Sequence, residues 1–100
     1  MLGINIFLIS GDSMQPLIPK NSYVISLPVL FKRVNSILIF KHEKYGDLVK
    51  RLISIDNDGN HWFKGESNQS VSSTKIGPIK EKDIIGRATL VFSKNKSFFL

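Results

Sequence analysis

Two residues of this sequence could together form a serine nucleophile and its base. Ser13 lies in Gly11-Asp12-Ser13-Met14-Gln15-Pro16-Leu17, which has the composition of a tight turn and follows an apolar run. Lys50 lies within the apolar run Val49-Lys50-Arg51-Leu52. A serine hydroxyl needs a neighbouring base at neutral pH, and a lysine amine can be that base only where desolvation lowers its pKa. The pair therefore predicts a serine–lysine hydrolase dyad.

Each of these residues also has a purely structural explanation. A serine in a Gly/Asp turn is common, so Ser13 alone fits a polar turn residue. On a strand, Lys50 shares one face with Leu48 and Leu52, whereas Arg51 lies on the other face, and alternation does not tell which face is inward. Arginine cannot release its proton, so only Lys50 could be the base. The competing interpretation is a lysine whose ammonium reaches water at a sheet edge.

The rest of the sequence predicts the strands that would position these residues. Short apolar runs separated by turn residues predict one all-β domain over residues 1–100, a small partly open barrel or sandwich. Strands are expected at 4–9, 23–27, 36–41, 48–55, 61–64 and 84–92. Asp58-Gly59 predicts a hairpin turn. The remaining segments predict a single helical turn at 29–33, a Ser-rich loop at 68–74 and a turn at 80–83.

Composition limits the functions that this chain can have. The absence of cysteine excludes disulfides, zinc–thiolate sites and cysteine nucleophiles, and we expect no metal or cofactor. The net charge of +6 comes from 14 basic and 8 acidic residues spread along the chain, which favours solvated surface lysines over a nucleic-acid site. No apolar run reaches the roughly 20 residues that span a bilayer. Cytoplasmic is the default location, with peripheral membrane contact through the apolar ends as the alternative.

Taken in order, these segments resemble the signal peptidase I superfamily of serine–lysine proteases, over Ile9 to Phe92. Gly11 to Leu17 resembles the nucleophile box, and Val49-Lys50-Arg51-Leu52-Ile53 resembles the lysine box. The remaining segments that carry the resemblance are Ser36-Ile37-Leu38-Ile39-Phe40, Gly65-Glu66-Ser67, Ser70-Val71-Ser72-Ser73, Gly77-Pro78-Ile79 and Ile85-Gly86-Arg87-Ala88. The resemblance implies the fold of signal peptidases and of the C-terminal domain of SOS repressors. It also implies removal of an N-terminal leader from an extended protein or peptide substrate, as in the compact nickel superoxide dismutase maturation protease.

The resemblance assigns a role to each residue of the site. Ser13 is the acyl-forming nucleophile, Lys50 is the general base, and Ser70 orients the lysine amine. The turn Gly11-Asp12-Ser13 supplies an oxyanion donor through the backbone N–H of Ser13. Met14 and Pro16 fix the turn and are candidates for substrate contact.

This chain also departs from the family pattern. Ser72 and Thr74 stand where the family has an aspartate and an arginine, so that ion pair is expected to be absent. Lys20-Asn21 and Asn35-Ser36 replace two Gly-Asp turns. These departures support an alternative, a catalytically inactive module of the same fold that binds a peptide or a protein.

Overall fold

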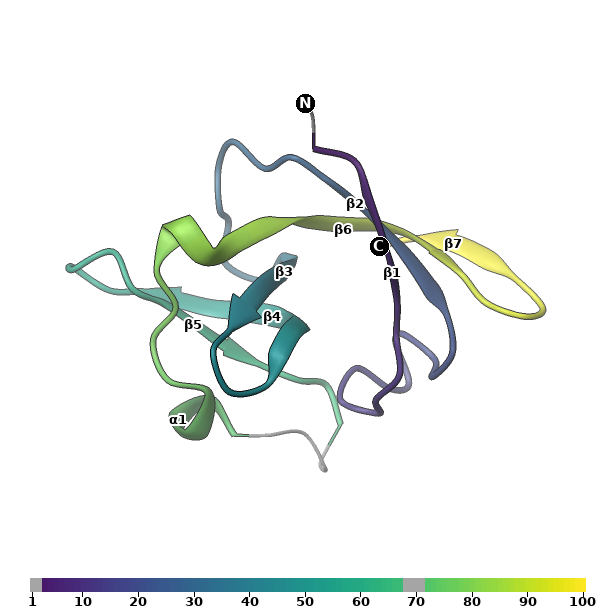
Figure 1. The fold of residues 1–100 in the computed structure, drawn as a ribbon, viewed down its shortest axis with the longest axis horizontal. Helices are drawn as coiled ribbons and strands as arrows, with labels where there is room; N and C mark the ends of the chain where they lie inside the picture. Colours follow the sequence, from purple (N-terminus) through teal and green to yellow (C-terminus); the bar gives the residue numbers. More distant parts are fainter. Residues whose placement is uncertain (1–2, 68–71) are drawn as a thin grey trace.

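The computed structural model describes residues 3–67 and 72–100, and it consists of a single antiparallel sheet with little helix (Figure 1). Its elements are β1 (Asn5–Leu8), β2 (Tyr23–Leu27), β3 (Ile37–His42), β4 (Gly46–Ile55), β5 (His61–Lys64), α1 (Ser73–Ile76), the 3-10 turn η1 (Glu81–Asp83), β6 (Ile84–Phe92) and β7 (Ser97–Phe99). The all-β prediction is confirmed. The sheet has seven strands within the described ranges and does not close into a barrel.

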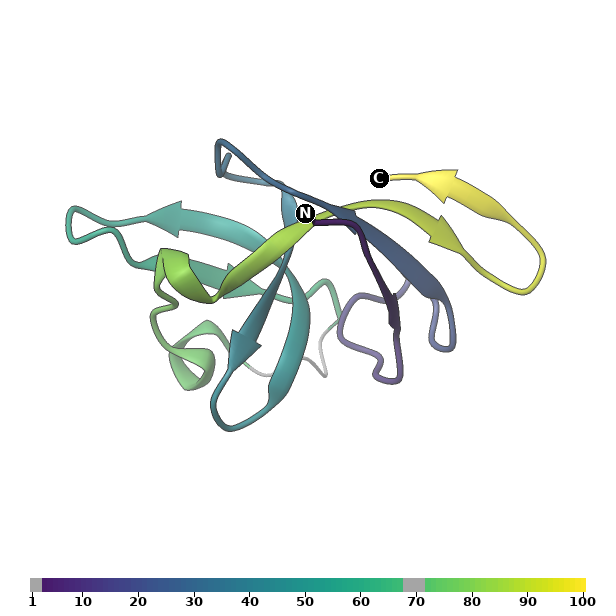
Figure 2. The same cartoon turned by 45° about the horizontal axis from the view of Figure 1, so that its top comes forward.

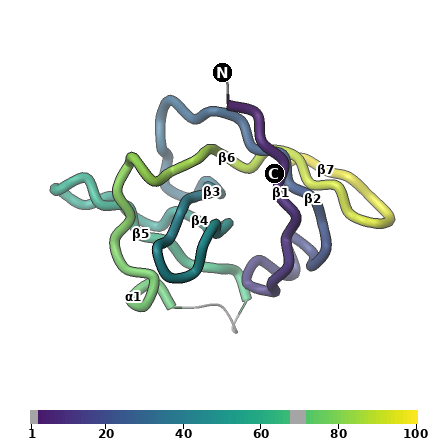
Figure 3. The backbone as a smooth tube through the Cα atoms, viewed as in Figure 1, coloured from purple at the N-terminus to yellow at the C-terminus, as the bar shows by residue number. Residues whose placement is uncertain are grey.

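The long strand β6 joins the two halves of the sheet (Figures 2 and 3). The strand order is β1-β2-β6-β3-β4-β5, and β7 also pairs with β6. Gly86 is the register partner of Ile39 on β3, and the next residue, Arg87, is the partner of Leu27 on β2. The backbones of β2, β3 and β6 therefore come together at this crossing.

Strand alternation sends side chains into two separate apolar clusters. The first cluster contains Met14, Ile18, Val24, Ile37, Ile39, Ala88 and Val91. The second contains Leu38, Phe40, Leu52, Phe63, Ile76 and Ile79, with the Phe40 and Phe63 rings stacked at 4.2 Å between centroids. Because β3 contributes alternate residues to each cluster, its residues from Ile37 to Phe40 are all buried. A strand covered on both faces reads as a continuous apolar run, as this one does.

The six strands expected from the sequence are confirmed, and so is the Asp58-Gly59 hairpin. The N–H of Asp56 donates to the carbonyl oxygen of Asn60 at 3.0 Å, and Gly59 adopts a φ of +81°. The apolar C-terminal end docks on the sheet as β7, with Phe98 against the first cluster.

Two local predictions were wrong. Residues 29–33 form no helical turn, because the chain turns later, where the N–H of Ser36 donates to the carbonyl oxygen of Arg33 and Asn35 takes a φ of +79°. Part of the expected Ser-rich loop is instead α1. Its first turn is capped by Ser72, whose hydroxyl accepts a hydrogen bond from the N–H of Lys75 at 3.3 Å.

We expect Gly86→Ala to destabilise the fold, because a Cβ at this position would lie 2.7 Å from the carbonyl oxygen of Leu27. The strands at the crossing must separate to relieve this contact, and such overpacking costs about 1–3 kcal/mol. The control is Gly11→Ala, where a Cβ meets nothing within 4 Å. Urea unfolding of both variants checks the prediction, and equal midpoints for Gly86→Ala and the wild type would contradict it.

Candidate active site

The loop that contains Ser13 is fixed by hydrogen bonds between its two ends and by the packing of Met14 in the core. The N–H of Ile9 donates to Ser22 at 2.8 Å, and the N–H of Asn21 donates back to Ile9 at 2.7 Å, which closes the loop. Asn21 takes a φ of +69°, a region that asparagine tolerates better than most side chains. Met14 is 1% exposed and packs in the first cluster. Ser13 therefore lies, partly buried, beside an anchored residue.

A second contact holds this turn against the segment that follows β5 (Figure 1). The backbone carbonyl oxygen of Ser13 accepts hydrogen bonds from the N–H of Glu66 at 2.7 Å and from the N–H of Ser67 at 2.9 Å. Two donors on one carbonyl leave the peptide unit of Ser13 little freedom to rotate. The segments resembling the nucleophile box and the last box are therefore in direct contact.

Lys50 is buried, with 2% of its surface exposed. It lies opposite Leu38 in the β3–β4 ladder, and Leu38 and the next residue on its own face, Leu52, both belong to the second cluster. Burial among these apolar side chains desolvates the amine and lowers the pKa of Lys50 from the usual lysine value. The sequence did not tell which face of this strand is inward, and the structure places Lys50 on the inward face. The competing interpretation, a lysine whose ammonium reaches water, is therefore wrong.

Arg51 lies on the other face of β4 and makes a paired contact that the sequence did not predict. Its Nε donates to Glu66 Oε2 at 3.0 Å and its Nη2 donates to Oε1 at 2.9 Å. A third bond runs from Nη1 to the carbonyl oxygen of Asn35 at 2.7 Å. The guanidinium of Arg51 lowers the pKa of the Glu66 carboxyl. Because Glu66 also donates its N–H to Ser13, this ion pair connects β4 to the nucleophile turn.

A groove of about 210 Å³ opens beside Ser13. It is lined by Leu8, Ile9, Ser10, Gly11, Ser13, Met14, Tyr45, Asp47, Leu48 and Val49. Ser13 and Met14 thus meet the residues that directly precede Lys50 on β4. Gly11 leaves open space in front of its Cα, so the turn itself does not fill the groove.

Some predicted site residues take other positions. Pro16 is exposed and does not line the groove, whereas Ser10, Tyr45 and Asp47 do and were not expected from the sequence. Asp12 accepts hydrogen bonds from Gln15, at its carbonyl oxygen and at its carboxylate, and stabilises the turn. Ser70 lies outside the described residues.

The aspartate–arginine pair that the resemblance would require has no counterpart at Ser72 and Thr74. These two hydroxyls lie 3.1 Å apart at the start of α1. An ion pair does join β4 to the segment after β5, but it is Arg51–Glu66, made by different residues.

Comparison with models of known protein families and with curated proteins finds no match for this chain. No helix within residues 3–67 and 72–100 is long and apolar enough to cross a membrane.

We expect Glu66→Gln to lower the free energy of unfolding by about 1.5–3 kcal/mol, because two charge-assisted hydrogen bonds of Arg51 are weakened in a partly buried place. Since pairing lowers the pKa of Glu66, the wild type loses this contribution as the pH falls through that pKa, and the variant does not. The control is Glu81→Gln, which removes the exposed pair with Lys32 (3.4 Å) and is expected to change little. Thermal unfolding from neutral to acid pH measures both, and equal losses in the two variants would contradict the assignment.

Proposed function

We propose that this chain is a serine endopeptidase that uses Ser13 as nucleophile and Lys50 as general base. The observation that carries the proposal is the burial of Lys50 with a lowered pKa on a strand that also lines the groove of Ser13. Burial is unfavourable for a charged lysine, and lysines with a lowered pKa are characteristic of functional sites, so this position supports the role of a base.

The fixed geometry of the nucleophile turn gives further support. The Ser13 carbonyl is held by two donors and Met14 is packed in the core, so the hydroxyl is attached to a rigid backbone. Preorganisation of this kind favours reaction, because little freedom has to be lost at the transition state. A backbone N–H at the same turn, that of Ser13, would be a donor to the oxyanion.

The substrate that fits this site is an extended peptide. Within the described ranges, β1 pairs only with β2, so its other edge is available for a further strand. Leu8, Ile9 and Ser10 continue from β1 into the groove that ends at Ser13. A peptide added along this edge would have its scissile bond directed toward Ser13, and the small groove suits a small residue at the cleaved position. The substrate class that we propose is a protein with an N-terminal leader.

The reaction follows from these roles. Neutral Lys50 accepts the hydroxyl proton of Ser13 while Oγ bonds to the scissile carbonyl carbon, forming a tetrahedral oxyanion. The C–N bond then breaks and the leaving amine takes the proton from Lys50, which leaves an acyl ester on Ser13. Water attacks the ester, Lys50 accepts one of its protons, and that proton returns to Ser13 as the acid product leaves.

Cleavage of peptides tests this proposal. Wild-type protein is incubated with a library of leader-like peptides, and products are identified by mass spectrometry. We expect cleavage at one type of site, loss of activity in Ser13→Ala, and a decrease of about 10²–10⁴-fold in Lys50→Met, which removes the base but keeps an apolar chain of similar length. The matched controls Ser54→Ala and Lys44→Met change an exposed serine and an exposed lysine and should retain activity. Peptide binding by the wild type without any cleavage would contradict the proposal and favour the inactive binding module.

The lowered pKa of Lys50 also predicts a pH dependence of stability. Between the folded and the unfolded pKa of Lys50 the unfolded chain binds more protons, so stability rises with pH across that window. Below the folded pKa the burial penalty is fully present, and above the unfolded pKa, about 10.4, it is gone.

Lys50→Met lacks this penalty. We therefore expect the Tm of Lys50→Met, relative to wild type, to be highest below the folded pKa and to fall as the pH approaches 10.4. Lys44→Met is the control, because Lys44 is exposed and should give a constant difference. Calorimetry at several pH values measures both, and a pH-independent difference for Lys50→Met would show that Lys50 does not titrate differently in the folded protein.

A further inference from the structure

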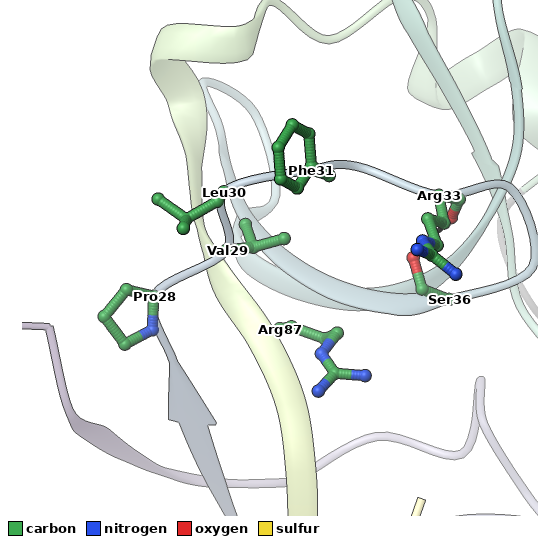
Figure 4. A pocket seen from close by; sticks show the side chains of 7 residues that line it. All are labelled: Pro28, Val29, Leu30, Phe31, Arg33, Ser36 and Arg87. Carbon is green, nitrogen blue, oxygen red and sulfur yellow. Dashed lines mark hydrogen bonds between the residues drawn. The ribbon is translucent and has the colours of Figure 1, made fainter.

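A second cavity lies on the loop between β2 and β3, and it combines basic and apolar side chains (Figure 4). Its volume is about 390 Å³, and it is lined by Pro28, Val29, Leu30, Phe31, Arg33, Ser36 and Arg87. Arg33 and Ser36 come from the loop, whereas Arg87 reaches the same cavity from β6. The loop stands out from the body at the top of the view in Figure 2.

The two arginines of this cavity are available for a ligand. Neither guanidinium makes a hydrogen bond or an ion pair with any described part of the chain, and both residues are exposed. No acidic residue lines the cavity. Glu81, the nearby carboxylate of η1, is paired with Lys32 at 3.4 Å. Two guanidinium groups are suited to phosphate, which arginine binds with paired N–H donors, while the Ser36 hydroxyl donates to the carbonyl oxygen of Arg33 and helps to fix the loop.

The apolar residues beside these arginines are unusually exposed. Leu30 is 85% exposed and Phe31 79% exposed, at consecutive positions of the loop. A neighbouring cavity shares Ser36 and Arg87 and is lined on its other side by Phe99 and Leu100, which are 80% and 37% exposed. Arg87 therefore has large exposed apolar side chains on two sides, from the loop and from the end of β7.

We propose that Leu30, Phe31, Arg33, Arg87 and Phe99 form a docking surface for an anionic phospholipid bilayer. The apolar side chains enter the acyl region, while Arg33 and Arg87 bind lipid phosphates at the level of the headgroups. This arrangement, an exposed apolar tip next to basic groups, is the usual composition of peripheral membrane contacts. The proposal does not depend on the proposed peptidase activity, since it shares no residue with the groove of Ser13.

Charge complementarity selects this occupant over the alternatives. A second copy of the chain would place the same arginines opposite each other, which is unfavourable for a chain with a net charge of +6. Single-stranded nucleic acid would match the arginines and could stack on Phe31. It would gain no stacking from Leu30 or Leu100, whereas acyl chains contact leucine and phenylalanine equally well.

Co-sedimentation of the full chain with vesicles tests the proposal. We expect binding to vesicles of phosphatidylcholine mixed with phosphatidylserine, and much weaker binding to phosphatidylcholine alone. Each of Arg33→Gln and Arg87→Gln should lower the partition coefficient about five-fold, and Leu30→Ser with Phe31→Ser should lower it at least about ten-fold. The control Lys75→Gln removes an exposed basic residue of α1 and should have a smaller effect than either arginine variant. Circular dichroism verifies that each variant is folded.

Several results would overturn the proposal. One is equal binding, or none, to the two kinds of vesicle. Another is binding that Lys75→Gln weakens as much as Arg87→Gln, which would indicate attraction by net charge alone. Tight binding of inorganic phosphate without vesicle binding would assign the cavity to a free anion. Dimerisation lost in the Leu30/Phe31 variant would assign the surface to a second copy, and displacement of bound vesicles by single-stranded DNA would assign it to nucleic acid.

Discussion

Strand β4 carries two adjacent basic residues, and the strict alternation of a β-strand sends them into different environments. Lys50 lies on the inward face beside Leu38 and Leu52 of the second apolar cluster, and only 2% of its surface is exposed. Arg51 turns to the other face and meets Glu66 in a bidentate pair. A shift of register by one residue would exchange the two side chains, burying a guanidinium that cannot lose its proton. Only one of the two registers is therefore compatible with a folded sheet.

The two environments also have opposite effects on stability. Burial of Lys50 is unfavourable while the amine is charged, whereas the Arg51–Glu66 pair stabilises the same strand from its other face. The Arg51–Glu66 pair also fixes the nucleophile turn, because the backbone N–H of Glu66 donates to the carbonyl oxygen of Ser13. The strand that supplies the proposed base thus also positions, through one ion pair and one hydrogen bond, the turn that supplies the proposed nucleophile.

Local sequence determined most of the fold, because the strands alternate or are continuously apolar and their turns contain strong signals such as Asp58-Gly59. The failures lie where local pattern is weak. β7 is three residues long and becomes a strand only by pairing with β6. The segment 29–33 has helix-compatible residues, but the chain turns directly after it, at Asn35 with a φ of +79°. Short elements of this kind depend on tertiary contacts that propensity does not contain.

Part of the candidate site could likewise be predicted from the sequence, and part could not. Ser13 and Lys50 could be proposed from their types and neighbours, but the face on which Lys50 lies could not, since alternation is symmetrical until a partner strand covers one side. Ser10 reaches the groove from the segment after β1, and Tyr45 and Asp47 reach it from the β3–β4 hairpin, and no spacing in the sequence brings these two segments together. The Arg51–Glu66 pair joins residues across the β4–β5 hairpin, so it became predictable only once the register of that hairpin was known.

Arg51 and Arg87 line one common cavity, yet they cannot have the same role. Arg51 is satisfied by Glu66 and by the carbonyl oxygen of Asn35, so an added anion would have to displace a carboxylate that is already well placed. Arg87 has no such partner among the described residues, and its position on β6, facing solvent beside Leu27, leaves its donors to an external ligand. The difference follows from their positions in the sheet: Arg51 lies within reach of Glu66 in the segment after β5, whereas Arg87 lies at the crossing of β2 and β6 and pairs with no carboxylate of the described residues. Arg51 therefore holds the segment after β5 against β4, whereas the guanidinium of Arg87 is available to the anionic surface that we propose.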